Sequence, residues 1–266
     1  MAVTLSASTA QAQEVILSVA DNTGNELGGL PFTDLDAVSY NTATGVSAPF
    51  FSIAAGDLDA FHLLPSGNVL VSSLFNGNFN GTIFDDGDIV EIDPDLLTVT
   101  TVFSSDDVFS STFEDISAVT VAPNGDLLIS TLTDATFETT TTFTDGDIMR
   151  YNPTTEDVTL EVAEASIFDD GDGDIYGLHL LEDGRYAISS VSDEVVSGVA
   201  FEDGDIFIWD PITDTAELFF DEDDFTGTNT YDVDAVYIVS IPEPATLGLL
   251  SVAGLGMLRR RRGGEA

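Results

Sequence analysis

Aspartate pairs on either side of a glycine recur along the chain and offer oxygen ligands for a cation. The motif reads FDDGDIVEID from Phe84, FTDGDIMRYN from Phe143 and FEDGDIFIWD from Phe201, and a looser copy, FTDLDAVSYN, begins at Phe32. Carboxylate and amide oxygens suit Ca²⁺, which accepts about six to eight ligands in irregular geometry. We expect the glycine, which tolerates positive φ, to let its two flanking carboxylates turn toward one point.

A further oxygen-bearing residue lies four positions after a repeated serine that precedes each motif, and it completes one candidate group per copy. The predicted calcium ligands are Asn76, Asp86 and Asp88; Asp134, Asp145 and Asp147; Asp193, Asp203 and Asp205; and Asn22, Asp34 and Asp36. The alternative is that Asp-Gly serves as plain turn chemistry, repeated because the surrounding structure repeats. The sequence leaves both interpretations open.

The charge balance favours the cation. Forty-eight acidic residues stand against six basic ones, and the formal net charge is −42. Such a field disfavours nucleic acid and anionic membrane surfaces as partners, whereas it favours cations or a salty medium. The sequence has no cysteine, which excludes disulfides, thiolate metal sites and thiol catalysis.

The sequence contains no recognised catalytic motif. A nucleophile elbow, a phosphate-binding loop and a histidine-rich metal motif are all missing from it. The two histidines, His62 and His179, occupy equivalent repeat positions at which the other copies have Thr120 and Tyr237, which indicates packing or channel lining. With so many acids, carboxylate pairs for glycoside hydrolysis occur at any separation and carry no weight. We therefore predict no catalytic residues and a protein that is not an enzyme.

A second motif sets the period of the repeat. It begins at Asp57 as DLDAFHLLPSGNVLVSS and returns at Asp115, Asp174 and Asp232, at intervals of 58, 59 and 58 residues. Each unit contains four short alternating or apolar runs that are separated by turn residues, including Pro-Asn-Gly and an Asn-Pro-Thr-Thr in which Asn152 suits an Asx-type turn. Four antiparallel strands per period of about 58 residues are typical of one blade of a β-propeller.

The segments outside the three complete units add up to a fourth. Residues 14–19, 36–41 and 46–51 align with the second, third and fourth strands of a unit, and residues 234–240 align with its first strand. A blade shared between the two ends of a chain closes a propeller and hides its last strand edges. We therefore predict an all-β, closed four-bladed β-propeller over residues 14–240. An open stack of four units and a larger ring made by two chains are the alternatives.

Aromatic residues recur where the predicted loop between the second and third strands ends. Phe32, Phe84, Phe143 and Phe201 hold this position in the four copies and are expected to anchor the loops in the core. The single tryptophan, Trp209, lies on a predicted third strand, where packing is the expected role.

The C-terminal segment, residues 241–266, reads as a membrane-directed tail. An uncharged stretch at residues 245–258 predicts a short apolar helix, although it falls below the roughly 20 residues that span a bilayer independently. Basic residues after an apolar segment favour a cytoplasmic C-terminus. The flanking residues are Pro242, Glu243 and Pro244 before the stretch, and Arg259, Arg260, Arg261 and Arg262 after it.

This tail resembles the PEP-CTERM sorting signal of Gram-negative bacteria. The resemblance covers about the last 25 residues. It implies recognition by an exosortase, a membrane cysteine protease-transpeptidase, and export by a cell that makes extracellular polysaccharide or biofilm. An ordinary tail anchor is the alternative, but the Pro-Glu-Pro triplet has no role in simple anchoring.

The N-terminal end suggests export as well. Residues 1–13, MAVTLSASTAQAQ, contain an Ala-Gln-Ala that resembles a signal-peptidase site, with cleavage after Ala12. A basic region and a full apolar region are missing from these residues. We interpret residues 1–13 as the remnant of a signal peptide whose start lies further upstream.

Together these features predict an exported, exosortase-sorted propeller at the cell surface or in the extracellular matrix of a Gram-negative bacterium. We expect the tail to hold it transiently in the inner membrane before processing. The expected role is a binding or structural module, stabilised by calcium and associated with exopolysaccharide, with polysaccharide or a surface protein as its partner. An extracellular hydrolase or lyase acting on polysaccharide is the alternative, followed by a purely structural coat protein.

Overall fold

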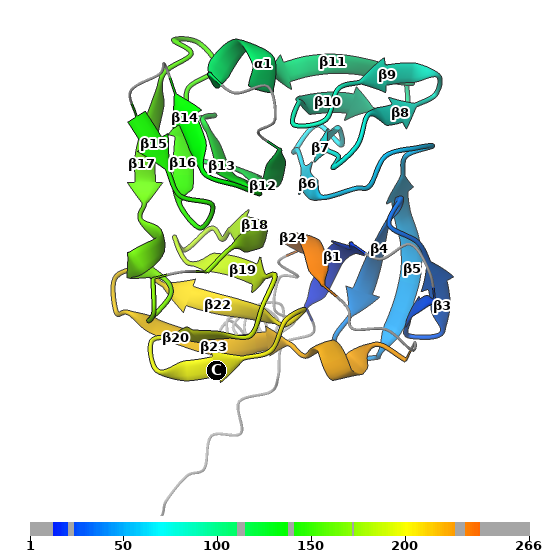
Figure 1. The fold of residues 1–266 in the computed structure, drawn as a ribbon. Helices are drawn as coiled ribbons and strands as arrows, with labels where there is room; N and C mark the ends of the chain where they lie inside the picture. Colours follow the sequence, from blue (N-terminus) through cyan, green and yellow to red (C-terminus); the bar gives the residue numbers. More distant parts are fainter. Residues whose placement is uncertain are drawn as a thin grey trace, which may run out of the picture.

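Four antiparallel sheets of four strands stand around a common axis in the computed structural model (Figure 1). It describes residues 13–20, 24–110, 115–137, 141–171, 173–226 and 232–239. The predicted all-β, four-bladed propeller is confirmed. The predicted helix at residues 245–258, the sorting tail around it and almost all of the predicted signal-peptide remnant lie outside the described residues, within which no helix is long and apolar enough to cross a membrane.

Each sheet is one blade, and the order of its strands from the axis outward is the same in all four. We number the blades so that blades 1 to 3 are continuous in sequence and blade 4 joins the two ends of the chain. In the order of blades 1 to 4, the innermost strands are β6 (Ala60–Leu63), β12 (Ile116–Val121), β18 (Ile175–Leu180) and β24 (Val233–Val239). The second strands are β7 (Val69–Ser72), β13 (Leu127–Thr131), β19 (Tyr186–Ser190) and β1 (Glu14–Val19).

The third and the outermost strands also hold the same places in all four blades. The third strands are β10 (Ile89–Asp93), β16 (Ile148–Tyr151), β22 (Ile206–Asp210) and β4 (Asp36–Asn41). The outermost strands are β11 (Thr98–Phe103), β17 (Val158–Val162), β23 (Thr215–Phe220) and β5 (Val46–Ser52).

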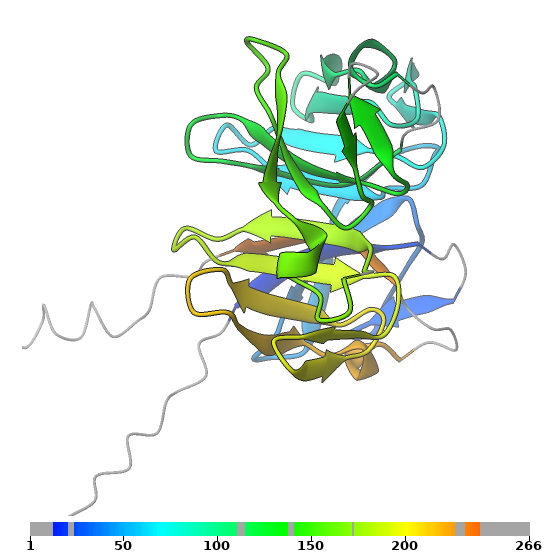
Figure 2. The same ribbon diagram turned by 60° about the vertical axis from the view of Figure 1, so that its left-hand side comes forward.

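The core lies between neighbouring blades. Four clusters of buried apolar side chains each combine residues of two adjacent blades, such as Phe103 of blade 1 with Ile129 of blade 2. Figure 2 shows blades 2 and 3 side by side in this arrangement. The inner strands are covered on both faces, which explains why β7 and β13 are buried at every residue, whereas the outermost β11 is buried only at its last residue.

Blade 4 closes the ring within one chain. β24 pairs with β1 in antiparallel register from Glu14 opposite Val239 to Val19 opposite Val233. The same blade packs against blade 3 on one side and blade 1 on the other. The predicted composite blade is therefore confirmed, and the chain forms a closed ring rather than an open stack.

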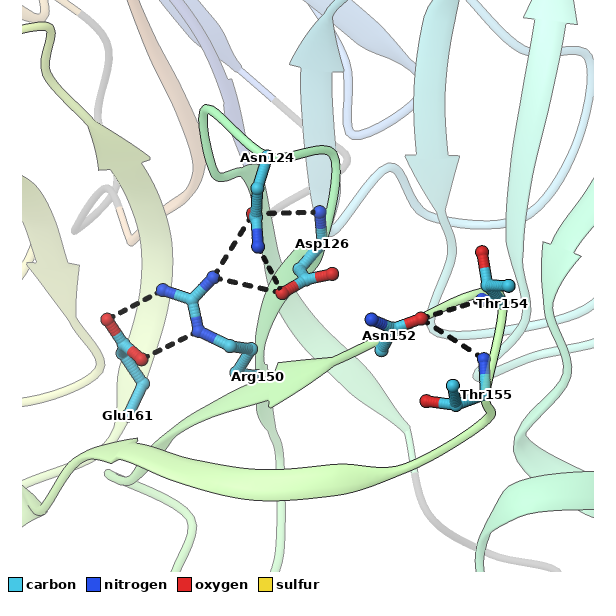
Figure 3. Close-up of polar contacts among 7 residues, drawn as sticks. All are labelled: Asn124, Asp126, Arg150, Asn152, Thr154, Thr155 and Glu161. Atoms are coloured by element: carbon cyan, nitrogen blue, oxygen red, sulfur yellow. Dashed lines mark hydrogen bonds and ion pairs between the residues drawn. The ribbon is translucent and has the colours of Figure 1, made fainter.

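The turns inside the blades follow the sequence signals. Gly125, in the hairpin between β12 and β13, has a φ of 91°, which a residue with a side chain rarely adopts. Asn152 forms the predicted Asx-type turn after β16, because its Oδ1 accepts hydrogen bonds from the backbone N of Thr154 at 2.9 Å and of Thr155 at 3.1 Å (Figure 3).

Arg150 links three elements of blade 2 across its surface. Its guanidinium forms a two-pronged ion pair with Glu161 of β17, with both N···O distances at 2.8 Å, and a contact of 3.2 Å with Asp126, the residue before β13 (Figure 3). In so acidic a protein such pairs are few, and an exposed pair contributes only about 0–1 kcal/mol. The fold therefore depends on packing rather than on ion pairs.

The long connections between second and third strands are more ordered than the loops predicted for them. Each contains a two-stranded ribbon: β2 (Asn25–Leu27) with β3 (Leu30–Phe32), β8 (Gly77–Phe79) with β9 (Thr82–Phe84), β14 (Ala135–Phe137) with β15 (Thr141–Phe143), and β20 (Glu194–Val196) with β21 (Val199–Phe201). The phenylalanine that ends each ribbon is buried in all four copies, which confirms the predicted anchors. Trp209 is also buried, against Tyr186.

Single helical turns follow the outermost strands of blades 1 to 3. They are α1 (Ser105–Val108), η1 (Glu164–Ser166) and η2 (Glu222–Asp224). These turns begin the connections from one blade to the next, and they bring backbone N–H groups to the face of the ring on which the third strands start.

Candidate functional site

The second aspartate of each Asp-Gly-Asp motif forms hydrogen bonds with backbone N–H groups. Oδ2 of Asp147 accepts from the backbone N of Thr144 at 3.0 Å, and its Oδ1 accepts from that of Glu164, the first residue of η1, at 2.9 Å. Asp205 repeats this arrangement in blade 3 with Glu202 at 3.0 Å and Glu222 at 3.1 Å. Each carboxylate therefore joins the turn before its third strand to the helical turn after the outermost strand.

The remaining two copies share part of this pattern. Asp88 in blade 1 accepts a hydrogen bond from the backbone N of Ser105, the first residue of α1, at 3.2 Å. Asp36 in blade 4 accepts from both the backbone N and the hydroxyl of Thr33, at 3.0 and 2.9 Å. Burial raises the pKa of Asp88, and the hydrogen bond from Ser105 opposes that rise. The hydrogen bonds of these second aspartates are those of turn chemistry.

The first aspartates and the loop residues are more open. Asp34, Asp145 and Asp203 are half-buried, and Asp86 is exposed. The loop residues contact the turns in two copies: Nδ2 of Asn76 donates to Asp85 at 3.3 Å, and Oδ1 of Asp193 accepts from the backbone N of Asp203 at 3.2 Å. The other two loop residues are Asp134, which is exposed, and Asn22, which lies outside the described residues.

The described part of the chain contains no group of three or more histidine, aspartate or glutamate side chains arranged to hold a metal ion directly. The structure thus directs the second aspartates toward backbone N–H groups, and it brings the loop residue to the turn in the two copies that contain Asn76 and Asp193. The prediction of calcium at these turns stays a prediction.

The glycine between the aspartates does not have one role in all copies. Gly87 and Gly204 have φ values of 74° and 83°, as predicted. Gly146 is not among the residues with positive φ; instead, a Cβ there would lie 2.0 Å from the backbone O of Gly173 and 2.5 Å from Cγ of Glu164. In blade 2 the glycine is therefore needed for close packing of the blade connection, and the prediction of a left-handed turn is wrong at this copy.

A second acidic group lies on the axis, at the same end of the ring as these turns. Each blade contributes to it the residue two positions after the aspartate that precedes its innermost strand. These residues are Asp59, Ser117, Tyr176 and Asp234. These four side chains, with Asp57, line a small cavity of about 40 Å³. The equivalent position of every blade thus faces the same central space.

The carboxyl groups around this cavity are buried and incompletely paired. Asp57, Asp59, Asp115 and Asp234 are at most 9% exposed, and each has one buried oxygen without a hydrogen-bond partner. Burial, together with the charges of neighbouring aspartates, raises the pKa of Asp57 and of Asp115 to about 7 and raises the pKa of Asp59 and of Asp234 well above the usual range. Buried carboxylates of like charge destabilise the fold unless protons or a cation offset them.

Among the described residues, Asp234 has one side-chain partner, the hydroxyl of Ser18. Oγ of Ser18 lies 2.7 Å from the backbone O of Leu58 and 2.5 Å from Oδ1 of Asp234. A serine hydroxyl has one hydrogen, so it donates to only one of these two oxygens. Ser18 therefore satisfies at most one oxygen of Asp234, and Oδ2 of Asp234 has no hydrogen-bond partner in this part of the chain.

Two histidines line the opposite end of the axis, as predicted. His62 and His179 lie with ring centroids 5.7 Å apart, and Tyr237 lies against both rings. Thr120 completes the ring of four through a 3.2 Å contact of its hydroxyl with Nδ1 of His62. Burial lowers the pKa of His62 to about 3 and of His179 to about 4, so both imidazoles are neutral at pH 7.

The sequence did not reveal the axial aspartates as a group. Asp57 and Asp115 stood out only as starts of the repeat, and Asp59 and Asp234 were not singled out. The available signal was the Asp-x-Asp spacing in blades 1 and 4, since alternate residues of a strand point to the same side. This spacing does not by itself predict an axial group, because the sequence does not show which side of the innermost strand faces the axis.

Comparison with known proteins identifies the segment that follows β24. Residues 240–262 match the family model of the PEP-CTERM protein-sorting motif. The chain carries a PEP-CTERM sorting signal. The signal implies that the protein is exported, held transiently in a membrane and processed by exosortase, and the predicted resemblance is confirmed. No curated protein is significantly similar to the chain.

The solved structures that the chain matches share little sequence with it. The extracellular domain of a one-component system from B. thetaiotaomicron is 8% identical, with a TM-score of 0.36 over 85% of this chain and 36% of that one. A catalytically inactive virginiamycin B lyase from Staphylococcus aureus, crystallised with quinupristin, is 12% identical, with a TM-score of 0.32 over 81% and 57%. An auxiliary nutrient binding protein from Bacteroides thetaiotaomicron is 10% identical, with a TM-score of 0.37 over 78% and 49%. The chain therefore spans between about a third and somewhat over half of these proteins.

Proposed function

We propose that the protein is a binding module of the cell surface or extracellular matrix of a Gram-negative bacterium, and that its ligand is an extracellular polysaccharide. The observation that carries the proposal is the sorting signal, which begins directly after the strand that closes the ring. Export followed by exosortase processing delivers a complete propeller to the outside of the cell. The absence of recognised catalytic motifs from the sequence supports binding rather than turnover.

A groove beside blades 4 and 1 supports a carbohydrate ligand. It has a volume of about 350 Å³ and is lined largely by aromatic and proline side chains, including Phe50, Phe51 and Phe79, with Asp36 and Ser52 as polar groups. Phe50 is 41% exposed, so its ring offers a flat apolar surface on which the C–H face of a sugar can stack. The strongly negative chain repels anionic glycans, and we therefore expect a neutral polysaccharide.

Binding of neutral bacterial exopolysaccharides on a glycan array, with assays for released reducing ends on the same polymers, tests this proposal. Phe50→Ala should weaken binding by about 5- to 100-fold, since an aromatic stacking contact contributes on the order of 1–3 kcal/mol. Phe75→Ala is the matched control, because Phe75 is also exposed, at 63%, but lies outside the groove. Release of reducing ends would contradict the proposal in favour of a hydrolase or lyase, and neither binding nor turnover would favour a coat protein.

Calcium stabilisation is the second part of the proposal. Its support is the density of carboxylates on one face of the ring, where cations reduce mutual repulsion. The melting temperature should rise in millimolar CaCl₂ and fall with chelator at fixed ionic strength. One site at ten times its dissociation constant adds about 1.4 kcal/mol. An equal rise with NaCl alone would show that salt suffices and that calcium has no specific role.

A further inference from the structure

The histidine end of the axis, opposite the acidic cavity, is hollowed into a pocket. Its volume is about 470 Å³, within the range of about 300–1,000 Å³ that is usual for small-molecule sites. Innermost strands and the hairpin between β18 and β19 provide most of its lining, which includes His62, His179, Leu181, Glu182, Asp183, Arg185, Tyr237 and Ile238. No residue of this lining also lines the Phe50 groove, so the two hollows are separate.

The floor of this pocket is closed where the four innermost strands meet. The ring centroid of Tyr237 lies 4.3 Å from that of His179 and 5.2 Å from that of His62. The hydroxyl of Thr120 lies 3.2 Å from Nδ1 of His62, and it accepts a hydrogen bond from the backbone N of Leu180 at 3.2 Å. Side chains in such close contact leave no passage along the axis. A ligand must therefore enter from the histidine end and stop at this floor.

The charges around the pocket disfavour an anionic ligand. Arg185 is the one arginine among the described residues of the lining, and its charge is already paired. Its Nε and Nη2 lie 3.0 and 2.9 Å from Oδ2 of Asp183, and its Nη1 lies 3.1 Å from Oε1 of Glu217. These contacts hold the guanidinium in place and use three of its five N–H groups. The remaining N–H groups can donate hydrogen bonds to a neutral ligand.

We propose that the histidine-end pocket binds a single neutral sugar unit. A sugar ring has apolar C–H faces and a rim of hydroxyl groups, and the lining offers partners for both. Leu181 and Ile238 provide apolar contacts, whereas the half-buried Tyr237 and Arg185 and the exposed Glu182 carry hydrogen-bonding groups. Because the floor is closed, the sugar is either a free molecule or the end of a polysaccharide chain. This site goes beyond the proposed function, since it does not depend on the Phe50 groove.

The two histidines report directly on the site, because the chain contains no others. We expect their imidazole C–H signals in proton NMR of the full chain to shift saturably at pH 7 with at least one methyl glycoside of glucose, galactose, mannose or N-acetylglucosamine. Methyl glucuronide, which is anionic, should cause no such shift. The site would be overturned if none of the four neutral glycosides moved either signal.

Chain length identifies the source of the sugar. At equal mass concentration, polymers of the sugar that binds should shift the histidine signals less as they lengthen, because longer chains offer fewer ends. Such a series would identify the end of a polysaccharide as the ligand, and a response to the monosaccharide alone would identify a free sugar. A response that does not depend on chain length would contradict a pocket with a closed floor.

Variants that keep the shape of the lining locate the sugar. Glu182→Gln should weaken binding by about tenfold, because hydrogen bonds to charged groups are the stronger ones, and Tyr237→Phe should weaken it by about two- to tenfold. Glu156→Gln is the matched control, since Glu156 is exposed and lies outside the pocket, and it should leave the affinity unaltered. Unchanged affinity in both Glu182→Gln and Tyr237→Phe would place the sugar elsewhere and overturn the site.

The Phe50 variant separates this site from the proposed function. Phe50→Ala should leave the histidine shifts unchanged, even where it abolishes binding of polysaccharide in the groove. Loss of the shifts in Phe50→Ala would assign both effects to the groove and overturn the second site. Histidine shifts without any binding that depends on Phe50 would support the second site and contradict the groove.

Discussion

Removing β24 is expected to abolish cooperative folding of the whole ring, even though the strand has only seven residues. A chain that ends at residue 231 loses the inner strand of blade 4 and leaves the edge of β1 unpaired. It also uncovers apolar surface on blade 3, against which Val233, Val236 and Ile238 of β24 are buried, and on blade 1, against which Ala235 is buried. Burial of three such side chains contributes roughly 5–9 kcal/mol, which is comparable to the total stability of a typical domain.

The matched control is a chain that ends at residue 240, which removes the sorting tail and keeps β24. It should unfold in one cooperative transition in urea, whereas the shorter chain should show no such transition and should bind a hydrophobic dye. A synthetic peptide of residues 232–240 should restore the transition to the shorter chain. Equal midpoints for the two truncated chains would show that blade 4 does not close the ring.

Acidification from pH 8 to pH 6 in the presence of chelator should raise the free energy of unfolding by roughly 2–4 kcal/mol. The folded-state pKa values of Asp57 and Asp115, at about 7, lie above the ordinary value of 3.8, and those of Asp59 and Asp234 are also raised well above it. Folding therefore favours the protonated carboxyls, so this stability is fully present below about pH 4 and is lost as the pH rises through 7.

Other groups around the axis modify this profile in known directions. The carboxylates that face the cluster are Asp34, Asp86, Asp174 and Asp232, and the phenol of Tyr176 lies among them. His62 and His179 act in the opposite sense, because their folded-state pKa values lie below the ordinary 6.5, so their contribution is lost as the pH falls below that value. Stability should therefore pass through a maximum in mildly acidic solution.

Urea unfolding at several pH values in 0.5 M NaCl measures the profile, since salt at about this concentration screens the general surface charge. The double variant Asp59→Asn with Asp234→Asn should flatten the slope between pH 6 and 8 while keeping the fall at lower pH that the histidines cause. An unchanged slope in the double variant would assign the pH dependence to groups away from the axis.

The repeat made the fold predictable from the sequence. Fixed spacing of Asp57, Asp115, Asp174 and Asp232 defined the blades, and the partial units at the two ends required closure by pairing of β1 with β24. The ribbons were missed because strands of three residues, such as those ending at Phe84, are too short to show a periodic pattern.

The site was predictable only in part. The sequence predicted one acidic turn in each copy of the repeat, but not the partners of the carboxylates: Asp147 bonds to Glu164, 17 residues later and on the far side of two strands. Local propensity carries no information about such a contact. The axial group could not be predicted either. Asp59 and Asp234 line one cavity because of the side that each innermost strand turns toward the axis, and the sequence pattern does not specify that side.

The direction of β24 fixes how the mature protein is displayed. The strand starts among the aspartates at Val233 and ends at Val239, beside the histidine end of the axis, and the sorting signal begins at the next residue. Whatever holds the protein at its C-terminus therefore holds it by the histidine end. Copies tethered to one surface by their C-termini would therefore all present the acidic end of the ring to the surrounding medium.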